Sequence, residues 1–118
     1  MGRSVLVVDD DASFRNLAAR ILRSWGHDVV GEAGSVAEAM ACSAELQPDT
    51  VLADIGLPDG DGFELTQRLL VLPWHPRVVL ISSDSDRANG PAAQRVGASA
   101  FFPKDELSGV PFRQMIEG

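Results

Sequence analysis

A single cysteine, Cys42, is present in the sequence, so no disulfide can form within this chain. Neither histidine, His27 or His75, has a nearby Cys or His partner, which excludes the usual zinc-binding motifs. No apolar run approaches the roughly 20 residues that a bilayer requires. The short apolar stretch near the N-terminus is followed by acidic residues, where a signal peptide would have small ones. These absences favour a protein of the reducing cytoplasm that has no membrane segment.

Positive charge is also scarce, with 10 Lys and Arg against 17 Asp and Glu and a net charge of −7. Because nucleic-acid phosphates are bound by clustered basic residues, this balance disfavours direct nucleic-acid binding. The hydrophobic fraction of 45% and the mean hydropathy of +0.03 are typical of a packed globular protein. With 118 residues, we expect one domain that spans 1–118.

Short apolar runs alternate with helical patterns along the chain, and this alternation is typical of βαβ units around a buried parallel sheet. The pattern predicts an α/β fold of five βα units, a (βα)5 doubly wound sheet. The expected strands are residues 5–8, 28–30, 51–53, 78–81 and 100–102.

The helices are predicted from apolar spacing and from residues that begin or end a helix. Apolar residues at three- and four-residue spacing, beginning with Phe14, predict a first helix that ends at a left-handed Gly26. Ser35 and Glu38 form a capping box that opens a second helix, which should end before Pro48. The expected core face of that helix consists of Val36, Ala39, Met40 and Leu46. The remaining helices are expected at 63–72, 91–97 (with Pro91 as first residue) and 107–116, with a loop at 84–90.

Four charged residues follow predicted strands at their C-terminal ends: Asp9, Asp10, Asp54 and Lys104. In a parallel sheet these ends meet at one edge, so the four side chains can build one site. Adjacent carboxylates raise each other's pKa unless a cation neutralises them, and oxygen ligands favour Mg²⁺. The acidic triplet alone fits a solvated turn that caps the first helix. Asp54, however, interrupts an apolar strand, where an unpaired carboxylate would be costly.

Lys104 and Ser82 add the groups that a phosphoryl-transfer site needs. A lysine can contact both a carboxylate and an incoming anion, as cationic clamps do in phosphoryl transfer. The hydroxyl of Ser82, at the end of the neighbouring strand, can bond a phosphoryl oxygen. Taken singly, each residue would be read as a surface charge or a turn residue. Together with the carboxylates they supply a nucleophile, a metal site, a cation and a hydrogen-bond donor.

These residues resemble response regulator receiver domains, of the single-domain kind found in chemotaxis, over nearly the whole chain. The motifs that carry the resemblance are Asp9-Asp10-Asp11 after the first strand, Asp54-Ile-Gly-Leu-Pro58 and Asp61-Gly62 after the third, Ser82-Ser83 after the fourth, and Gly97-Ala98 leading to Phe101 and Lys104. The resemblance implies a flavodoxin-like strand order, 2-1-3-4-5.

The resemblance also implies a role for each acidic residue. Asp54 would be the phosphoacceptor, taking a phosphoryl group from a phosphohistidine of a sensor histidine kinase or a phosphotransfer protein. Asp10 and Asp54 would bind Mg²⁺ directly and Asp9 mainly through water. The backbone carbonyl of Gly56 would complete the protein ligands. The chain would then be a signalling phosphoacceptor of a phosphorelay and not an enzyme, apart from self-catalysed phosphotransfer and dephosphorylation.

For the switch, the resemblance implies that Lys104 pairs with a phosphoryl oxygen and that Ser82 moves to bond the phosphoryl group. Phe101, three residues before the lysine, would turn inward and so bias a surface for a downstream partner. Read alone, Phe101 fits plain core packing equally well. A monomer and a phosphorylation-dependent dimer both stay open, as does the identity of the kinase and the target.

Two departures and two alternatives accompany this interpretation. Asp105 stands where many receiver domains have a proline in a cis bond, and Asn89-Gly90-Pro91 predicts a short or displaced fourth helix. One alternative is a degenerate receiver that binds a partner without phosphorylation. The other is a phosphatase resembling haloacid dehalogenases, because Asp9, Asp11 and Ser13 match a D-x-D-x-S motif in which Asp9 would be the nucleophile.

Overall fold

The computed structural model describes residues 2–83 and 89–118, and its centre is one parallel sheet. The strands of this sheet are β1 (Ser4–Val8), β2 (Asp28–Ala33), β3 (Thr50–Asp54), β6 (Arg77–Ser82) and β7 (Ala100–Pro103). Their order is β2-β1-β3-β6-β7, and every neighbouring pair is parallel. Counted along the chain this is 2-1-3-4-5, so the predicted doubly wound α/β fold is confirmed.

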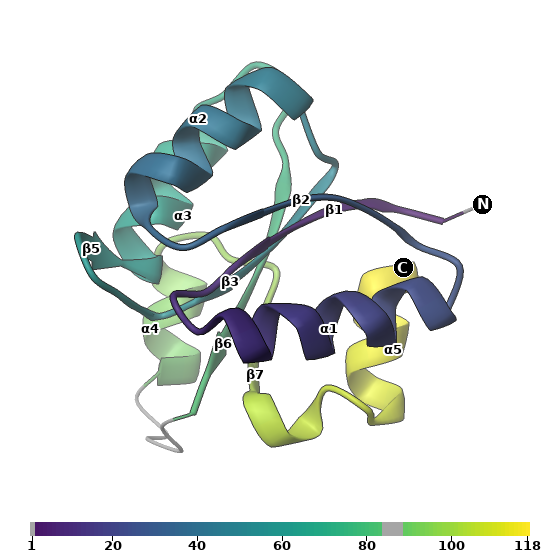
Figure 1. Ribbon diagram of the computed structural model, residues 1–118. Coiled ribbons are helices and arrows are strands. Elements are labelled where there is room, and N and C mark those ends of the chain that lie inside the picture. The colour runs from purple at the N-terminus through teal and green to yellow at the C-terminus, as the bar shows by residue number, and fades with distance from the viewer. Residues whose placement is uncertain (1, 84–88) are drawn as a thin grey trace.

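Helices cover both faces of the sheet (Figure 1). They are α1 (Ala12–Ser24), α2 (Val36–Leu46), α3 (Gly62–Leu70), α4 (Asn89–Arg95) and α5 (Val110–Glu117). Helices α1 and α5 pack on one face, and α2, α3 and α4 pack on the other. Within the part of the chain that the structure describes, none of these helices has the length and apolarity to cross a membrane.

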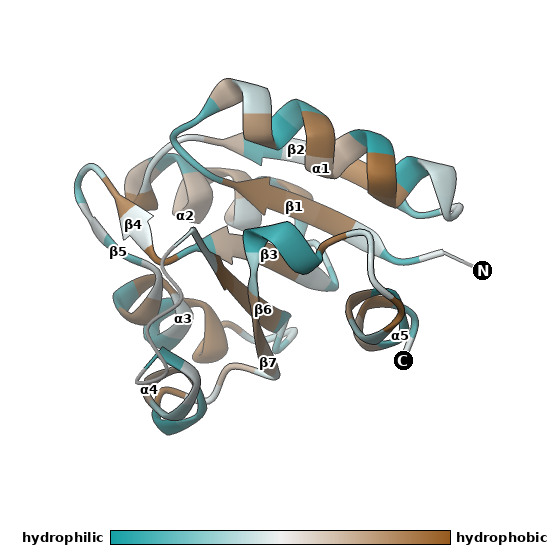
Figure 2. Cartoon of the chain, turned by 90° about the horizontal axis from the view of Figure 1, so that it is seen from below, coloured by the Kyte–Doolittle hydropathy of each residue, from teal (hydrophilic) through white to brown (hydrophobic). Residues whose placement is uncertain are grey.

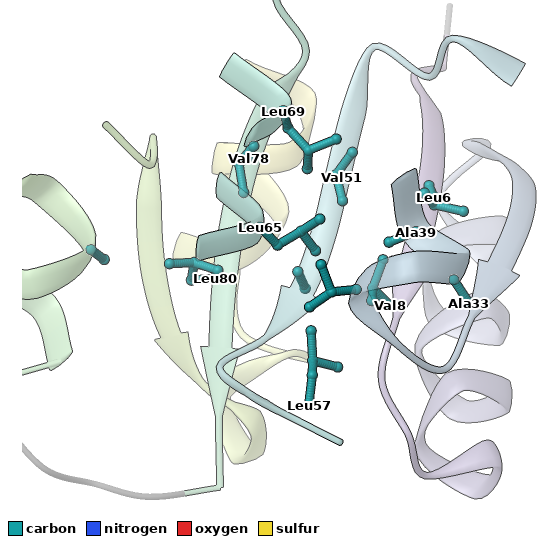
Figure 3. Close-up of a cluster of buried hydrophobic side chains, with 13 residues drawn as sticks. Leu6, Val8, Ala33, Ala39, Val51, Leu57, Leu65, Leu69, Val78 and Leu80 are labelled. Carbon is teal, nitrogen blue, oxygen red and sulfur yellow. The ribbon is translucent and has the colours of Figure 1, made fainter. Parts of the chain in front are cut away.

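The two-sided packing follows from the alternation of side chains along each strand. Val5 and Val7 of β1 face α1 and α5, whereas Leu6 and Val8 face the opposite layer. The inner strands are therefore apolar on both faces, as the brown colour of β1, β3 and β6 in Figure 2 shows. Figure 3 shows the buried cluster on the face covered by α2, α3 and α4, in which leucines of α3 lie beside valines of β3 and β6.

Side chains of Asp11, Ser35 and Asp61 cap α1, α2 and α3, and two of the predicted helix ends, at Ser35 and Gly26, are confirmed. Ser35 Oγ accepts a hydrogen bond from the Glu38 N–H at the start of α2, and Gly26 adopts a left-handed φ of 88° after α1. Asp11 caps α1 by accepting from the Ser13 N–H. The core face predicted for α2 is wrong at Leu46, which is 40% exposed because the end of α2 lies over the edge strand β2.

Several predicted boundaries are wrong. Strand β2 continues to Ala33, and the loop after β3 contains an antiparallel pair, β4 (Gly56–Leu57) with β5 (Gly60–Asp61). Helix α3 begins at Gly62 and ends two residues earlier than predicted. A 3₁₀ helix, η1 (Lys104–Glu106), comes before α5, which starts three residues later than predicted although Leu107 is buried.

The predicted loop 84–90 is only partly testable, since residues 84–88 lie outside the described part of the chain. Asn89 and Gly90 are helical, so Pro91 is the third residue of α4 and not the first. A proline is tolerated there because the N–H groups of the first turn have no partner within the helix. Within the described residues α4 has seven residues, which agrees with the short fourth helix that the sequence predicted.

Candidate functional site

The ends of four neighbouring strands bring the predicted site residues to one edge of the sheet. Asp9 directly follows β1, Asp54 ends β3, Ser82 ends β6, and Lys104 directly follows β7. The Lys104 Nζ lies 2.6 Å from Asp9 Oδ2 and 3.2 Å from Asp54 Oδ2. The lysine therefore joins two carboxylates that come from separate strands.

The acidic residues form a cluster that suits a hard cation. One carboxylate oxygen from each of Asp9, Asp10 and Asp54 lies within 4.8 Å of the others. Asp9 is fully buried and Asp54 nearly so, whereas Asp10 is exposed. Lys104 offsets one of the three negative charges. Because the donors are oxygens and the outermost one is open to water, their chemistry fits Mg²⁺.

Burial and charge shift the pKa values of two groups in this cluster. Burial, followed by repulsion from Asp9, raises the pKa of Asp54, although Lys104 and the Gly56 N–H act in the opposite direction. Burial alone would lower the pKa of Lys104, but the bond to Asp9 and the charge of Asp54 outweigh it and raise that pKa. Lys104 is therefore a firmly protonated cation at neutral pH.

A cavity of about 200 Å³ opens beside the lysine. It is lined by Ser82, Ser83, Pro103, Lys104 and Asp105. The register pairs Ser82 with Pro103, so the ends of β6 and β7 form its walls. Ser82 is nearly buried, at 6% exposure. The cavity thus places a hydroxyl and an ammonium together at the ends of β6 and β7.

Phe14 contributes to the site without having been predicted to do so. The Lys104 Nζ lies 4.3 Å from the centre of the Phe14 ring, a cation–π contact. Sequence reasoning treated Phe14 as one more apolar residue of the first helix. The only feature of the sequence that could have indicated this contact is the position of Phe14, four residues after Asp10 in the first turn of α1.

The loop after Asp54 is held by three further hydrogen bonds. The Gly62 N–H donates to the Ile55 carbonyl at 2.8 Å, and a Cβ on Gly62 would lie 2.7 Å from the Asp54 carbonyl oxygen. Asp59, between β4 and β5, accepts hydrogen bonds from the N–H groups of Val36 at 2.7 Å and Ala37 at 3.0 Å. The loop after β3 is therefore tied to the start of α2.

Asp59→Asn is expected to lower the stability of the fold in a pH-dependent way. The hydrogen bonds from Ala37 and Val36 lower the pKa of Asp59 below its ordinary value of 3.8. The charged carboxylate thus contributes stability that is fully present above that value and is lost as the pH falls through the lowered pKa. Denaturant midpoints of both proteins, measured from neutral pH downward, should converge in acid. A difference that is the same at every pH would contradict this role.

Comparison with known proteins identifies the family of this chain. Residues 5–110 match the family model described as the response regulator receiver domain. The chain belongs to this family. The receiver domain is 32% identical over 104 residues to the chemotaxis protein CheY of Thermotoga maritima, which covers 88% of this chain and 87% of CheY. It is 43% identical over 103 residues to the DNA-binding transcriptional activator DevR/DosR of Mycobacterium tuberculosis.

The second match covers 86% of the receiver domain but only 47% of DevR/DosR, so the chain spans about half of that relative. Among solved structures, the signal receiver domain of the putative response regulator NarL from Mycobacterium tuberculosis superposes with a TM-score of 0.89. The two are 30% identical, and the match covers 98% of this chain and 94% of that one. Sequence and fold therefore agree on the family.

The two adjacent phenylalanines of β7 point to opposite layers of the receiver domain. Phe102 packs edge to face against Phe112, with ring centres 5.4 Å apart. Phe101 is half-buried against the cluster on the other face and lines a cavity of about 300 Å³ between α4 and β7. Ala93 and Gln94 of α4 lie on the same cavity. Phe101 therefore has space beside it on the side of α4.

Proposed function

We propose that this receiver domain accepts a phosphoryl group on Asp54 and thereby switches a protein-interaction surface. The donor would be a phosphohistidine of a sensor histidine kinase or phosphotransfer protein in the cytoplasm. The observation that carries the proposal is the position of Lys104, whose Nζ contacts Asp9 at 2.6 Å and Asp54 at 3.2 Å beside a solvent-open carboxylate. This arrangement supplies a nucleophile, a cation and oxygen ligands at one strand edge.

In the transfer step, a carboxylate oxygen of Asp54 attacks the phosphorus atom of the donor. The new bond joins this oxygen to phosphorus, and the bond from phosphorus to the donor imidazole nitrogen breaks with its electron pair staying on that nitrogen. Lys104 lies where its ammonium can pair with an oxygen of the incoming group. When bound, Mg²⁺ would offset the negative charge that gathers during transfer.

The three aspartates would divide the binding of Mg²⁺ between them. Both oxygens of Asp9 already have partners, since Oδ1 accepts from the Asp11 N–H and Oδ2 contacts Lys104. Both contacts are shorter than those of Asp54, whose Oδ1 lies 3.4 Å from the Gly56 N and whose Oδ2 lies 3.2 Å from Lys104 Nζ. The tighter engagement of Asp9 supports a contact through water, with Asp10 and Asp54 as direct ligands. The carbonyl of Gly56, two residues after the acceptor, would be the further protein ligand. The same engagement and full burial of Asp9 disfavour it as the nucleophile of a phosphatase.

The switch would run from Asp54 through Ser82 to Phe101. Ser82 ends the strand next to Asp54, and its register partner on β7 lies two residues after Phe101. If the Ser82 hydroxyl moves toward a phosphoryl group, the ring of Phe101 can shift into the space beside α4. Such a shift would change the surface that α4 and β7 present to a downstream protein.

The test is intact-mass analysis after incubation with acetyl phosphate, a small phosphoryl donor, with Mg²⁺ or with EDTA. One phosphoryl adduct that requires Mg²⁺ is expected, and its mass separates it from acetylation. No adduct, together with no beryllofluoride binding, would favour the degenerate receiver that acts without phosphorylation.

Gly56→Arg is expected to lengthen the lifetime of the phosphorylated state. A Cβ on Gly56 would meet no atom within 4 Å, so a side chain fits there without disturbing the loop. A long side chain at this exposed position can lie over the site and obstruct the water that hydrolyses the aspartyl-phosphate. The rate of phosphate loss after removal of the donor measures the effect, with Gly56→Ala as the small control. Equal rates for Arg and Ala variants would contradict the expectation.

A further inference from the structure

Arg15, at the start of the second turn of α1, contacts the peptide group between Asp9 and Asp10 and two groups near it. Its Nη1 donates to the backbone carbonyl of Asp9 at 2.6 Å. Its Nε pairs with Glu32 Oε1 at 3.2 Å, which ties it to β2. Its own backbone N–H donates to the Asp11 carbonyl at 3.0 Å. The side chain is only 21% exposed, so one guanidinium bridges α1, β2 and the acidic turn.

The bond to the Asp9 carbonyl bears directly on Asp10. A peptide unit is planar, so fixing this carbonyl fixes the ψ angle of Asp9 and the φ angle of Asp10 together. The other side of the turn is also held, because the Asp9 N–H donates to the Ala33 carbonyl at 2.9 Å. The direction in which the exposed Asp10 side chain leaves the backbone is therefore set from outside the site, by Arg15.

The charge of Arg15 is balanced away from the carboxylates. Glu32 forms an ion pair with it, and a Cβ on Gly34 would lie 3.4 Å from both Arg15 Nη1 and Glu38 Oε1. Two acidic side chains thus accompany the guanidinium on the β2 and α2 side. Arg15 can orient the peptide while much of its repulsion toward a bound cation is offset.

We propose that Arg15 is a positioning residue for the Mg²⁺ site, and that Glu32 orients Arg15. This inference rests on the proposed function, since it concerns the same metal site. Mutation of a residue that orients a metal ligand through a hydrogen bond typically weakens metal affinity by about 10–100-fold. Arg15 bonds the Asp9 carbonyl and Glu32 through two separate nitrogens, Nη1 and Nε, whereas a lysine carries all its donors on one nitrogen and does not reproduce this fork. Arg15→Lys keeps the charge, so it separates orientation from electrostatics.

The experiment is a titration of the whole chain with MgCl₂. The ¹H–¹⁵N chemical shifts of the amides in the Asp9–Asp11 turn report the binding. Arg15→Lys should weaken Mg²⁺ binding about tenfold. Arg20→Lys is the matched control, because Arg20 is exposed on the same helix, and it should bind as the unaltered chain does. Melting temperatures in EDTA are measured for each protein in parallel.

A second pair of variants keeps Arg15 itself in place, in case Arg15→Lys does not fold. Glu32→Ala removes the partner of the Arg15 Nε. It should also weaken Mg²⁺ binding, but by less than Arg15→Lys does. Glu45→Ala removes one negative charge from an exposed position of α2 and should leave binding unchanged.

The outcomes are distinct. Arg15→Lys that binds Mg²⁺ like the unaltered chain, while melting lower in EDTA, would overturn the inference by showing a structural role only. If Arg15→Lys does not fold and Glu32→Ala binds no more weakly than Glu45→Ala, the inference is equally overturned. An unaltered chain that does not bind Mg²⁺ would overturn the proposed function as well. Weaker binding in Arg15→Lys with Arg20→Lys unaffected would support the positioning role.

Discussion

Asp54→Asn is expected to abolish the phosphoryl adduct formed with acetyl phosphate and Mg²⁺. The amide oxygen is a poor nucleophile, and the variant keeps the size and shape of the side chain at the end of β3. Because Asp9 and Lys104 stay in place, loss of the adduct would be loss of the acceptor and not of the fold. Intact-mass analysis of both proteins under the same conditions makes the measurement.

The control for this variant is Asp28→Asn. Asp28 is an exposed aspartate at the opposite end of the sheet, where β2 begins, and its replacement should leave the adduct unchanged. An adduct that persists in Asp54→Asn and disappears in Asp9→Asn would contradict the proposed acceptor and favour the phosphatase-like alternative.

Asp54→Asn should also be more stable than the unaltered chain when Mg²⁺ is absent. Burial and repulsion from Asp9 raise the pKa of Asp54 in the folded protein above the ordinary 3.8. The folded state therefore holds its proton more tightly than the unfolded chain, so stability falls as the pH rises through this range. At neutral pH the ionised carboxylate costs stability, and an amide removes that cost. Melting temperatures of both proteins in EDTA test the sign of this difference. With Mg²⁺ present, the difference should shrink or reverse.

The parts of this site that the sequence predicts are those fixed by strand periodicity. Asp9, Asp54 and Lys104 each follow an apolar run, and a parallel sheet has only one edge at which its strands end. Their contact therefore followed from the fold class, before any distance was known. The family resemblance then added the roles proposed for Asp54, Ser82 and Phe101, which residue chemistry alone leaves open.

The contacts that hold these residues in place could not be predicted. Asp59 bonds an N–H group 23 residues earlier in the chain, and Arg15 bonds a side chain 17 residues later. Neither contact has a local signature, because a carboxylate in a turn and an arginine on a helix are equally common as solvated groups. Phe14 was assigned to the core by helical spacing, which identifies the face of a helix but not the cation beneath that face.

The predicted ends of the helices were wrong for a related reason. The last helix was predicted to begin near Leu107, and that residue is buried. It reaches the core from the segment between η1 and α5, and not from the helix itself. A buried apolar residue thus marks the core correctly while giving the wrong element, which is why boundaries were less accurate than topology.

Lys104→Met is expected to lower both stability and phosphorylation. The substitution keeps an unbranched side chain but leaves the fully buried Asp9 carboxylate without its cation. Removing one partner of a buried ion pair costs about 3 kcal/mol or more. The loss should be largest in EDTA, since Mg²⁺ binds only the folded site and stabilises it by mass action. Denaturant unfolding of both proteins, with and without Mg²⁺, measures the difference.

Lys104→Arg separates the charge of the lysine from its position. Arginine retains a cation for Asp9, so most of the stability should return, but its planar guanidinium does not reproduce a compact ammonium between two carboxylates. Phosphorylation should therefore stay low while stability recovers. Equal recovery of both properties would mean that Lys104 acts only by neutralising charge. No stability loss in Lys104→Met would contradict the proposed pairing, since Asp9 would then be satisfied by some other group.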